Sequence, residues 1–153
     1  MTDNVEYITG DIFTTTLPAL GHGVIIYGVM GSGIAVLVRR NFPDIYIPYK
    51  TACENKTLLA GGFQPILTKS GMWIFNMASQ DKPGANASLS FLEATTETAF
   101  IFAEQQSISG FALPRIGAGV GGLDWEDVDE SLNRIAALHP TVKLEIWTLP
   151  EKD

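Results

Sequence analysis

The sequence predicts an α/β fold, a three-layer α/β/α sandwich in which helices cover both faces of a mixed β-sheet. Two observations predict it. Short apolar or alternating runs, typical of strands, interleave along the chain with longer segments that have helical spacing. The 153 residues, 46% of them hydrophobic, suffice to fill one sizeable core. We therefore expect a single domain over residues 1–153, without internal repeats.

The first third of the chain predicts two strands and two helices. The segments 5–8 (VEYI) and 23–27 (GVIIY) read as strands, and the second is apolar throughout, as a strand covered on both faces should be. A helix over 33–42 follows directly, because its apolar residues recur at helical spacing. We expect a short helix over 45–53, where Pro48 suits only a first turn or a break.

The rest of the chain predicts a hairpin, two helices and two further strands. The turn KSG joins the two hairpin strands, and Pro65 favours an edge position for the first of them. The stretch 88–106 has helical spacing and contains no Gly or Pro, and Asp124 is typical of the cap of a following helix. The expected strands are 62–68, 72–77, 111–116 and 142–147.

Charge and composition exclude several classes of function. Binding to a nucleic-acid backbone needs clustered Lys and Arg, and a net charge of −7 argues against such a surface. We therefore expect no nucleic-acid partner. The single Cys53 and an N-terminus without signal-peptide character predict a cytoplasmic protein. No apolar run approaches the ~18–20 residues that span a bilayer, so we expect no membrane partner.

Two glycine-rich segments each follow a predicted strand and precede a predicted helix. We name GVMGSGI (28–34) the first glycine loop and GAGVGGL (117–123) the second glycine loop. Glycines let the main chain approach a ligand closely, and a helix N-terminus attracts phosphate. The first loop has neither the Lys-Ser/Thr of a Walker loop nor the spacing of the dinucleotide fingerprint. The pair indicates a phosphate-binding cleft, although each loop alone also fits a tight strand-to-helix turn.

Four stretches of the sequence resemble a macrodomain, the ADP-ribose-binding module. They are YITGDIF (7–13), GHGVIIYGVMGSGIAVLVRRNFP (21–43), MWIFNMASQ (72–80) and LPRIGAGVGGLDWEDV (113–128). The resemblance covers nearly the whole chain. It is strongest to the branch that contains terminal ADP-ribose protein glycohydrolases and ADP-ribose 1″-phosphate-processing proteins.

The resemblance implies that ADP-ribose or a derivative binds in a cleft between the two loops. It implies that Asp11 receives the adenine amine beside the main chain of Ile12, although capping a turn also accounts for Asp11. The first loop would bind the diphosphate and the second would form the facing wall. The expected ligand-binding residues are Asp11, Ile12, Gly28, Met30, Gly31, Ser32, Gly33, Ile34, Gly117, Ala118, Gly119, Val120 and Gly121. We expect no metal and no cofactor.

The sequence departs from its relatives where the resemblance would imply catalysis. Many macrodomains carry an Asn near the distal ribose, and the matching position here is Ile25. The Lys of the glycohydrolase branch aligns with Ala78 or Ser79, and its Asp aligns with Gly121. The first hypothesis is therefore a binding module for ADP-ribose or a derivative.

The alternative is a hydrolase that acts on ADP-ribose 1″-phosphate or on ADP-ribosylated protein. Its candidate catalytic residues are His22, as general acid or base, and Lys82, as a nucleophile. Yeast-type ADP-ribose 1″-phosphate phosphatases similarly carry a His just before the second strand. A hydrogen-bonded turn histidine is the favoured alternative for His22, and a solvated loop lysine is the favoured alternative for Lys82.

A third hypothesis is a protein that sequesters a modified ADP-ribose. Ile25 and Ile26 would make the distal end of the cleft more apolar than usual, which suits a bulkier, less polar terminal group. Gln80 and Asp81 are further candidates for contact with the distal ribose. Arg115 is expected to pair with an acid or with phosphate.

Overall fold

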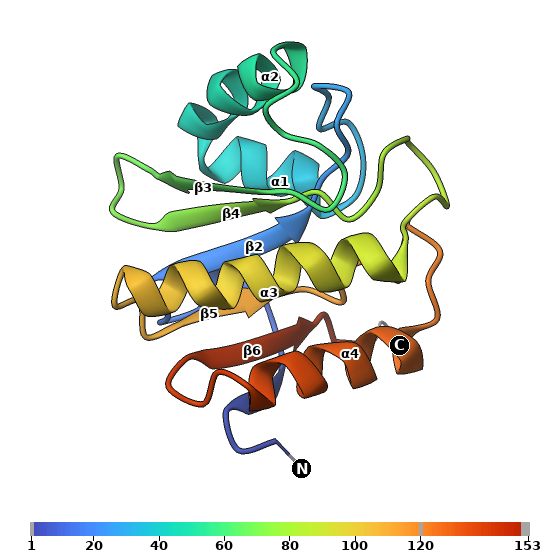
Figure 1. The fold of residues 1–153 in the computed structure, drawn as a ribbon. Helices are drawn as coiled ribbons and strands as arrows, with labels where there is room; N and C mark the ends of the chain where they lie inside the picture. Colours follow the sequence, from blue (N-terminus) through green and yellow to red (C-terminus); the bar gives the residue numbers. More distant parts are fainter. Residues whose placement is uncertain (1, 120, 151–153) are drawn as a thin grey trace.

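The computed structural model describes residues 2–119 and 121–150, and these residues form a three-layer α/β/α sandwich around one six-stranded sheet (Figure 1). The strand order is β1-β6-β5-β2-β4-β3, and every pair is parallel except β3 with β4. The strands are β1 Val5–Thr9, β2 Ala19–Gly23, β3 Phe63–Leu67, β4 Trp73–Met77, β5 Gly110–Leu113 and β6 Lys143–Thr148. The predicted mixed sheet is therefore confirmed.

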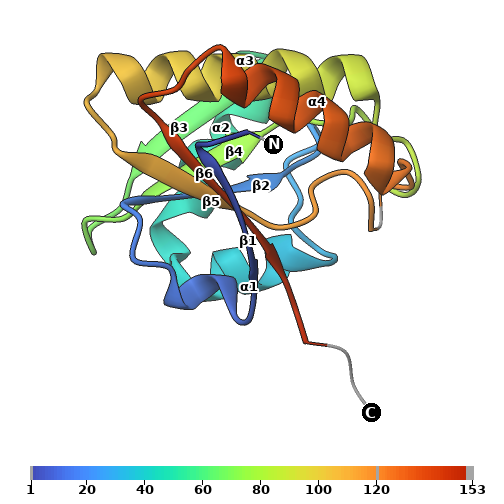
Figure 2. The ribbon, with the colours of Figure 1, turned by 90° about the horizontal axis from the view of Figure 1, so that it is seen from below.

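Helices cover both faces of the sheet and bury two apolar clusters against it. They are α1 Ile34–Asn41, α2 Tyr46–Glu54, α3 Leu89–Gln105 and α4 Trp125–Ala137, with short 3-10 turns η1 Ile12–Thr14 and η2 Pro43–Ile45. Figure 2 shows α3 and α4 on one side of the sheet and α1 on the other. Phe100 and Leu132 anchor the first cluster, and Val38 and Tyr49 anchor the second; all four are fully buried. In the described ranges, no helix is both long and apolar enough to cross a membrane.

Most predicted elements are confirmed to within a few residues. The hairpin is antiparallel, and Pro65 lies in β3, the edge strand, as expected. The long helix expected over 88–106 is α3. The strand expected over 111–116 is shorter, because the chain leaves the sheet after Leu113 and Pro114 has no N–H to continue the ladder.

The strand predicted over 23–27 is wrong, and the observed strand β2 is Ala19–Gly23. β2 lies between β4 and β5, and its neighbours leave no room for a side chain at Gly21. A Cβ there would lie 2.6 Å from Cδ2 of Leu113. Packing from neighbouring strands thus overrides the low strand propensity of glycine. The apolar residues after Gly23 lead out of the sheet toward the first glycine loop.

Candidate ligand-binding site

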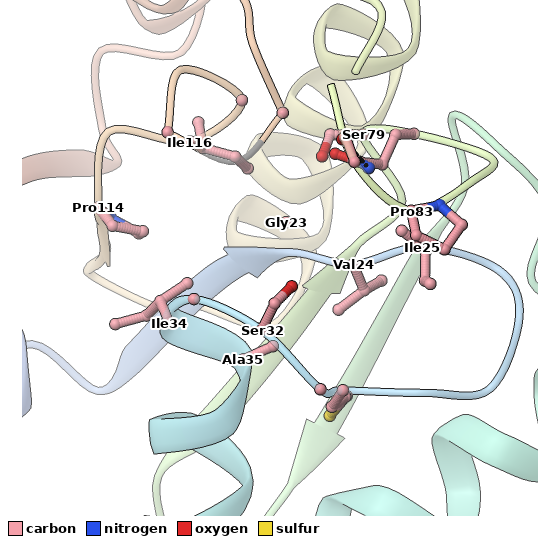
Figure 3. Close-up of a pocket in the computed structure, with 18 of the residues that line it drawn as sticks. Gly23, Val24, Ile25, Ser32, Ile34, Ala35, Ser79, Pro83, Pro114 and Ile116 are labelled. Atoms are coloured by element: carbon pink, nitrogen blue, oxygen red, sulfur yellow. Dashed lines mark hydrogen bonds between the residues drawn. The ribbon is translucent and has the colours of Figure 1, made fainter. Parts of the chain in front are cut away.

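A cavity of about 480 Å³ opens at the carboxyl edge of the parallel strands β5, β2 and β4 (Figure 3). Loops that follow strands at this edge are where α/β sheets bind ligands. Three segments surround the cavity: the first glycine loop with the residues before it, the second glycine loop with the end of β5, and the chain after β4. The lining residues are 23–25, 29–35, 79, 80, 83, 84, 114–117, 119 and 121.

The first glycine loop presents the N-terminus of α1 to the cavity. Gly33 is the N-cap residue, with φ 60° and ψ −146°, a conformation that favours glycine. No side chain of a described residue caps this helix, and its first turn contains no acid. The first N–H groups of α1 therefore lack helical partners, and the positive end of the helix dipole lies at the cavity wall.

Two tyrosines of α2 hold the carbonyl groups around the first glycine loop. The Tyr46 hydroxyl donates to the Gly28 carbonyl at 2.8 Å. The Tyr49 hydroxyl donates to the carbonyls of Ile25, at 2.6 Å, and Val29, at 3.2 Å. Burial raises the pKa of Tyr49, which keeps its hydroxyl protonated as a donor. Because these carbonyls bind α2, the loop is fixed with acceptors directed away from the cavity.

The second glycine loop forms a closely packed wall. Gly117 has φ 78° and Gly121 is buried. A Cβ at Gly121 would lie 2.7 Å from the Gly117 carbonyl oxygen and 2.8 Å from the Ala87 Cβ. The helix after this loop, α4, is capped by its own sequence, since the Asp124 carboxylate accepts from the Glu126 N–H at 2.9 Å. The N-terminus of α4 is thus satisfied within the chain.

The chain after β4 folds back onto the second glycine loop. The Gln80 side-chain amide donates to the carbonyls of Lys82, at 2.6 Å, and Gly84, at 2.9 Å. The Ala87 N–H donates to the Gly121 carbonyl at 3.1 Å. We name residues 80–87 the β4–α3 segment. Its internal hydrogen bonds and its contact with the loop fix one end of the cavity.

Main-chain groups, a few polar side chains and a single cationic side chain line the cavity among the described residues. Among the described lining residues, Arg115 is the only one with an ionisable side chain, and its guanidinium lies 5.1 Å from the ring centroid of Trp125. The other polar lining side chains are Ser32, Ser79 and Gln80. Within residues 2–119 and 121–150, no three His, Cys, Asp or Glu side chains group as metal ligands. The lining therefore offers donors for phosphate and no carboxylate that would repel it.

The structure brings most of the predicted ligand-binding residues to the cavity. Those that line it are Met30, Gly31, Ser32, Gly33, Ile34, Gly117, Gly119 and Gly121, whereas Asp11, Ile12, Gly28 and Ala118 do not. Val120 lies outside the described residues. Asp11 follows β1 with an exposed side chain that caps η1 by accepting from the Phe13 N–H at 3.0 Å.

Neither candidate catalytic side chain reaches the cavity. His22 is fully buried within β2, and its Nε2 lies 2.7 Å from the Asn76 Oδ1. The Asn76 amide donates to Gln64, so its oxygen is the acceptor and His22 Nε2 carries the proton. Burial lowers the pKa of His22 to about 4, which keeps the ring neutral. Lys82 is exposed on the β4–α3 segment and is not a lining residue.

Sequence reasoning missed lining residues at strand ends, in the loops and in the first turn of α1. These are Gly23, Val24, Val29, Ala35, Pro83, Gly84, Pro114 and Ile116. The sequence prediction places Gly23 and Val24 in the strand 23–27, and Pro114 and Ile116 in the strand 111–116. The lack of an N–H in Pro114 was a signal that the strand ends there.

The fold and the cavity define an α/β/α protein with a cavity between two glycine loops at the carboxyl edge of a mixed sheet. The Macro domain model matches residues 22–132, and the chain belongs to this family. A DNA ADP-ribosyl glycohydrolase of Mycobacterium tuberculosis is 30% identical over 131 residues, which cover 84% of this chain and 37% of that protein. The chain thus spans well under half of that relative.

A further relative and a solved domain structure match over nearly the whole of the compared chains. The ADP-ribose 1″-phosphate phosphatase of Candida albicans is 26% identical, with 88% of this chain and 96% of that protein covered. The solved macrodomain of Mycobacterium tuberculosis DarG is 29% identical and superposes with a TM-score of 0.88, covering 96% of this chain and 98% of that one. The macrodomain fold predicted from the sequence is confirmed.

Proposed function

We propose that this protein binds ADP-ribose or a derivative in the cavity between the two glycine loops. One observation carries the proposal: the N-terminus of α1, which has no side-chain cap among the described residues, lies at the cavity, and the Gly28 and Val29 carbonyls of the preceding loop are bonded to tyrosines of α2. Such a site stabilises a diphosphate through main-chain N–H groups and the helix dipole. The volume of about 480 Å³ falls within the usual range for a small-molecule site.

The strand order supports an orientation for the ligand. β1 and β6 lie beyond β5, so Asp11, after β1, lies on the β5 side of the cavity. Its exposed carboxylate can accept a hydrogen bond from the adenine amine. With the diphosphate at the N-terminus of α1, the terminal ribose then falls on the β4 side, near Ser79 and Gln80. This orientation is the one that the resemblance implies.

Hydrolysis is the second candidate function, and the names of the relatives favour it. One relative is an ADP-ribosyl glycohydrolase and another is a phosphatase of ADP-ribose 1″-phosphate. The cavity favours binding instead, since Arg115 is the one ionisable side chain among its described lining residues. A guanidinium keeps its proton and cannot act as a general base.

The partners follow from the proposed ligand. An ADP-ribosylated protein is the proposed macromolecular partner. The absence of a nucleic-acid partner stays a prediction. The name of the Mycobacterium tuberculosis relative, a DNA ADP-ribosyl glycohydrolase, favours the opposite outcome. The lone Cys53 supports a cytoplasmic location.

Calorimetric titration with ADP-ribose tests binding. We expect a Kd on the order of micromolar, and AMP, which lacks the second phosphate and the terminal ribose, should bind about tenfold more weakly. Circular dichroism of the same sample serves as the control for folding. A folded sample that takes up no ADP-ribose would refute the proposal.

Incubation with ADP-ribose 1″-phosphate, with ADP-ribosylated protein and with ADP-ribosylated DNA tests hydrolysis. We expect release of phosphate or ADP-ribose at the rate of the buffer alone. Turnover that disappears in His22→Ala or Lys82→Ala would restore the catalytic roles predicted for these residues. Turnover that survives both substitutions would establish the second function through other groups.

A further inference from the structure

The end of the cavity on the β4 side is walled by apolar side chains. Val24, Ile25 and Pro83 line it, and Figure 3 shows Ile25 and Pro83 at the opposite end from Ile34 and Pro114. Ile25 is fixed by its main chain, because its carbonyl accepts the Tyr49 hydroxyl at 2.6 Å. This hydrogen bond holds the main chain from which the Ile25 side chain extends.

The polar side chains at this end, Ser79 and Gln80, are uncharged. The Gln80 amide group already donates to the carbonyls of Lys82 and Gly84. Arg115, the one ionisable side chain among the described lining residues, follows Pro114 at the β5 side. A charge on a ligand at the β4 side would thus have no side-chain counter-charge from the described lining residues.

The facing wall has no room for an added polar side chain. A Cβ at Gly121 would lie 2.8 Å from the Ala87 Cβ and 3.1 Å from the Gln80 Oε1. The Ala87 N–H is bonded to the Gly121 carbonyl, so the two segments are held together at this point. The small apolar surface of this wall is thus imposed by packing.

We propose that the β4-side end of the cavity is a subsite for an uncharged, carbon-rich group attached to the terminal ribose of ADP-ribose, and that it discriminates against a terminal phosphate. The inference rests on the proposed function and names its ligand class more closely. A phosphate there would gain no counter-charge from the described residues that line this end, whereas an apolar group would bury surface against Val24, Ile25 and Pro83.

Titration with three ligands that share the ADP-ribose core tests the subsite. They are ADP-ribose, its 1″-phosphate and its 1″-O-benzyl glycoside. We expect the benzyl glycoside to bind at least as tightly as ADP-ribose and the 1″-phosphate to bind about tenfold more weakly. A 1″-phosphate that binds as tightly as ADP-ribose, or a benzyl glycoside that does not bind, would overturn the inference.

Substitutions at Ile25 and Pro83 test whether these residues cause the preference for the benzyl glycoside. In Ile25→Asn, the affinity ratio of the benzyl glycoside to ADP-ribose should fall by about tenfold. Leu59→Asn makes the same kind of change at a side chain that is 58% exposed and does not line the cavity, and it should keep the parent ratio. Pro83→Ser provides a second test of the wall at an exposed residue if Ile25→Asn lowers stability. An unchanged ratio in both wall variants would overturn the inference.

The outcomes separate this inference from the proposed function. If ADP-ribose itself does not bind to folded protein, both are wrong. If ADP-ribose binds but the order of the two derivatives is reversed, only the terminal subsite is wrong.

Discussion

The two glycine loops look alike in sequence and differ in what they offer a ligand. The first precedes α1, whose N-terminus has no side-chain cap among the described residues. The second precedes α4, which is capped by Asp124 and carries Glu126 and Asp127 in its first turn. Acids in that turn stabilise the helix and repel an anion. We therefore expect the first loop to bind the anion and the second to form a wall of the cavity, a difference that depends on the residues after the glycines.

The supports of the two loops also differ. Hydroxyl groups of Tyr46 and Tyr49 bind carbonyls around the first loop. The second loop is braced by main chain, through the hydrogen bond from the Ala87 N–H to the Gly121 carbonyl. Side-chain substitutions should therefore affect the first loop more than the second.

The largest expected effect is a loss of folding stability in acid, through protonation of His22. This residue lies in β2, the strand that leads to the first loop. Burial lowers its pKa from 6.5 to about 4, so the unfolded chain binds the proton more readily. The stabilisation is complete above the unfolded pKa and is lost as pH falls toward about 4, a loss of about 3 kcal/mol. Urea unfolding at several pH values measures it. His22→Gln should flatten this dependence, and an unchanged slope would contradict the assignment.

Gly33→Asp should abolish most binding. The residue would have to adopt φ 60°, which costs strain, and its carboxylate would compete with phosphate for the N-terminus of α1. We expect an affinity for ADP-ribose at least about 100-fold lower by calorimetry. Gly119→Asp introduces the same charge into the second loop at an open position. A loss as large in Gly119→Asp would remove the distinction between the loops.

Tyr49→Phe should weaken binding by about tenfold, because it frees two carbonyls around the first loop and leaves the core volume almost unchanged. The free energy of unfolding should fall by about 1–2 kcal/mol. Tyr7→Phe is the matched control, since it removes a hydroxyl that is bonded to Asp129 and does not line the cavity. Equal affinity losses in the two variants would show that Tyr49 does not position the loop.

Asp124→Ala gives the smallest expected change in affinity, within about twofold of the parent. It removes the cap of α4 and should lower the free energy of unfolding by about 1 kcal/mol. Thermal unfolding and calorimetry on one sample separate the two effects. A strong loss of affinity would mean that the N-terminus of α4 also binds the ligand.

Sequence reasoning located the loops well because glycine spacing encodes local geometry. Gly28, Gly33 and Gly117 adopt positive φ, a requirement of the turn itself. The predicted position of β2 is wrong because the glycines of that strand are required by packing against residues distant in sequence, such as Leu113 beside Gly21. Local propensity contains no information on such contacts.

Contacts between residues distant in sequence also determine the place of His22 and the role of the two tyrosines of α2. The position of His22 within β2, rather than in a turn, is fixed by strand pairing with β4 and β5. The tyrosines of α2 gave no sequence signal, since their role requires the fold to bring α2 beside the first loop.

The crowding at Gly121 bears on how this chain can change its chemistry. The relatives that the resemblance describes carry an acid at the matching position, yet here Ala87 already occupies the space into which any side chain would extend. A designer who grafts the acid alone should obtain a misfolded wall and no new activity. A Cβ at Gly121 would also lie 2.7 Å from the Gly117 carbonyl oxygen, so both the β4–α3 segment and the second glycine loop would have to move before an acid fits there.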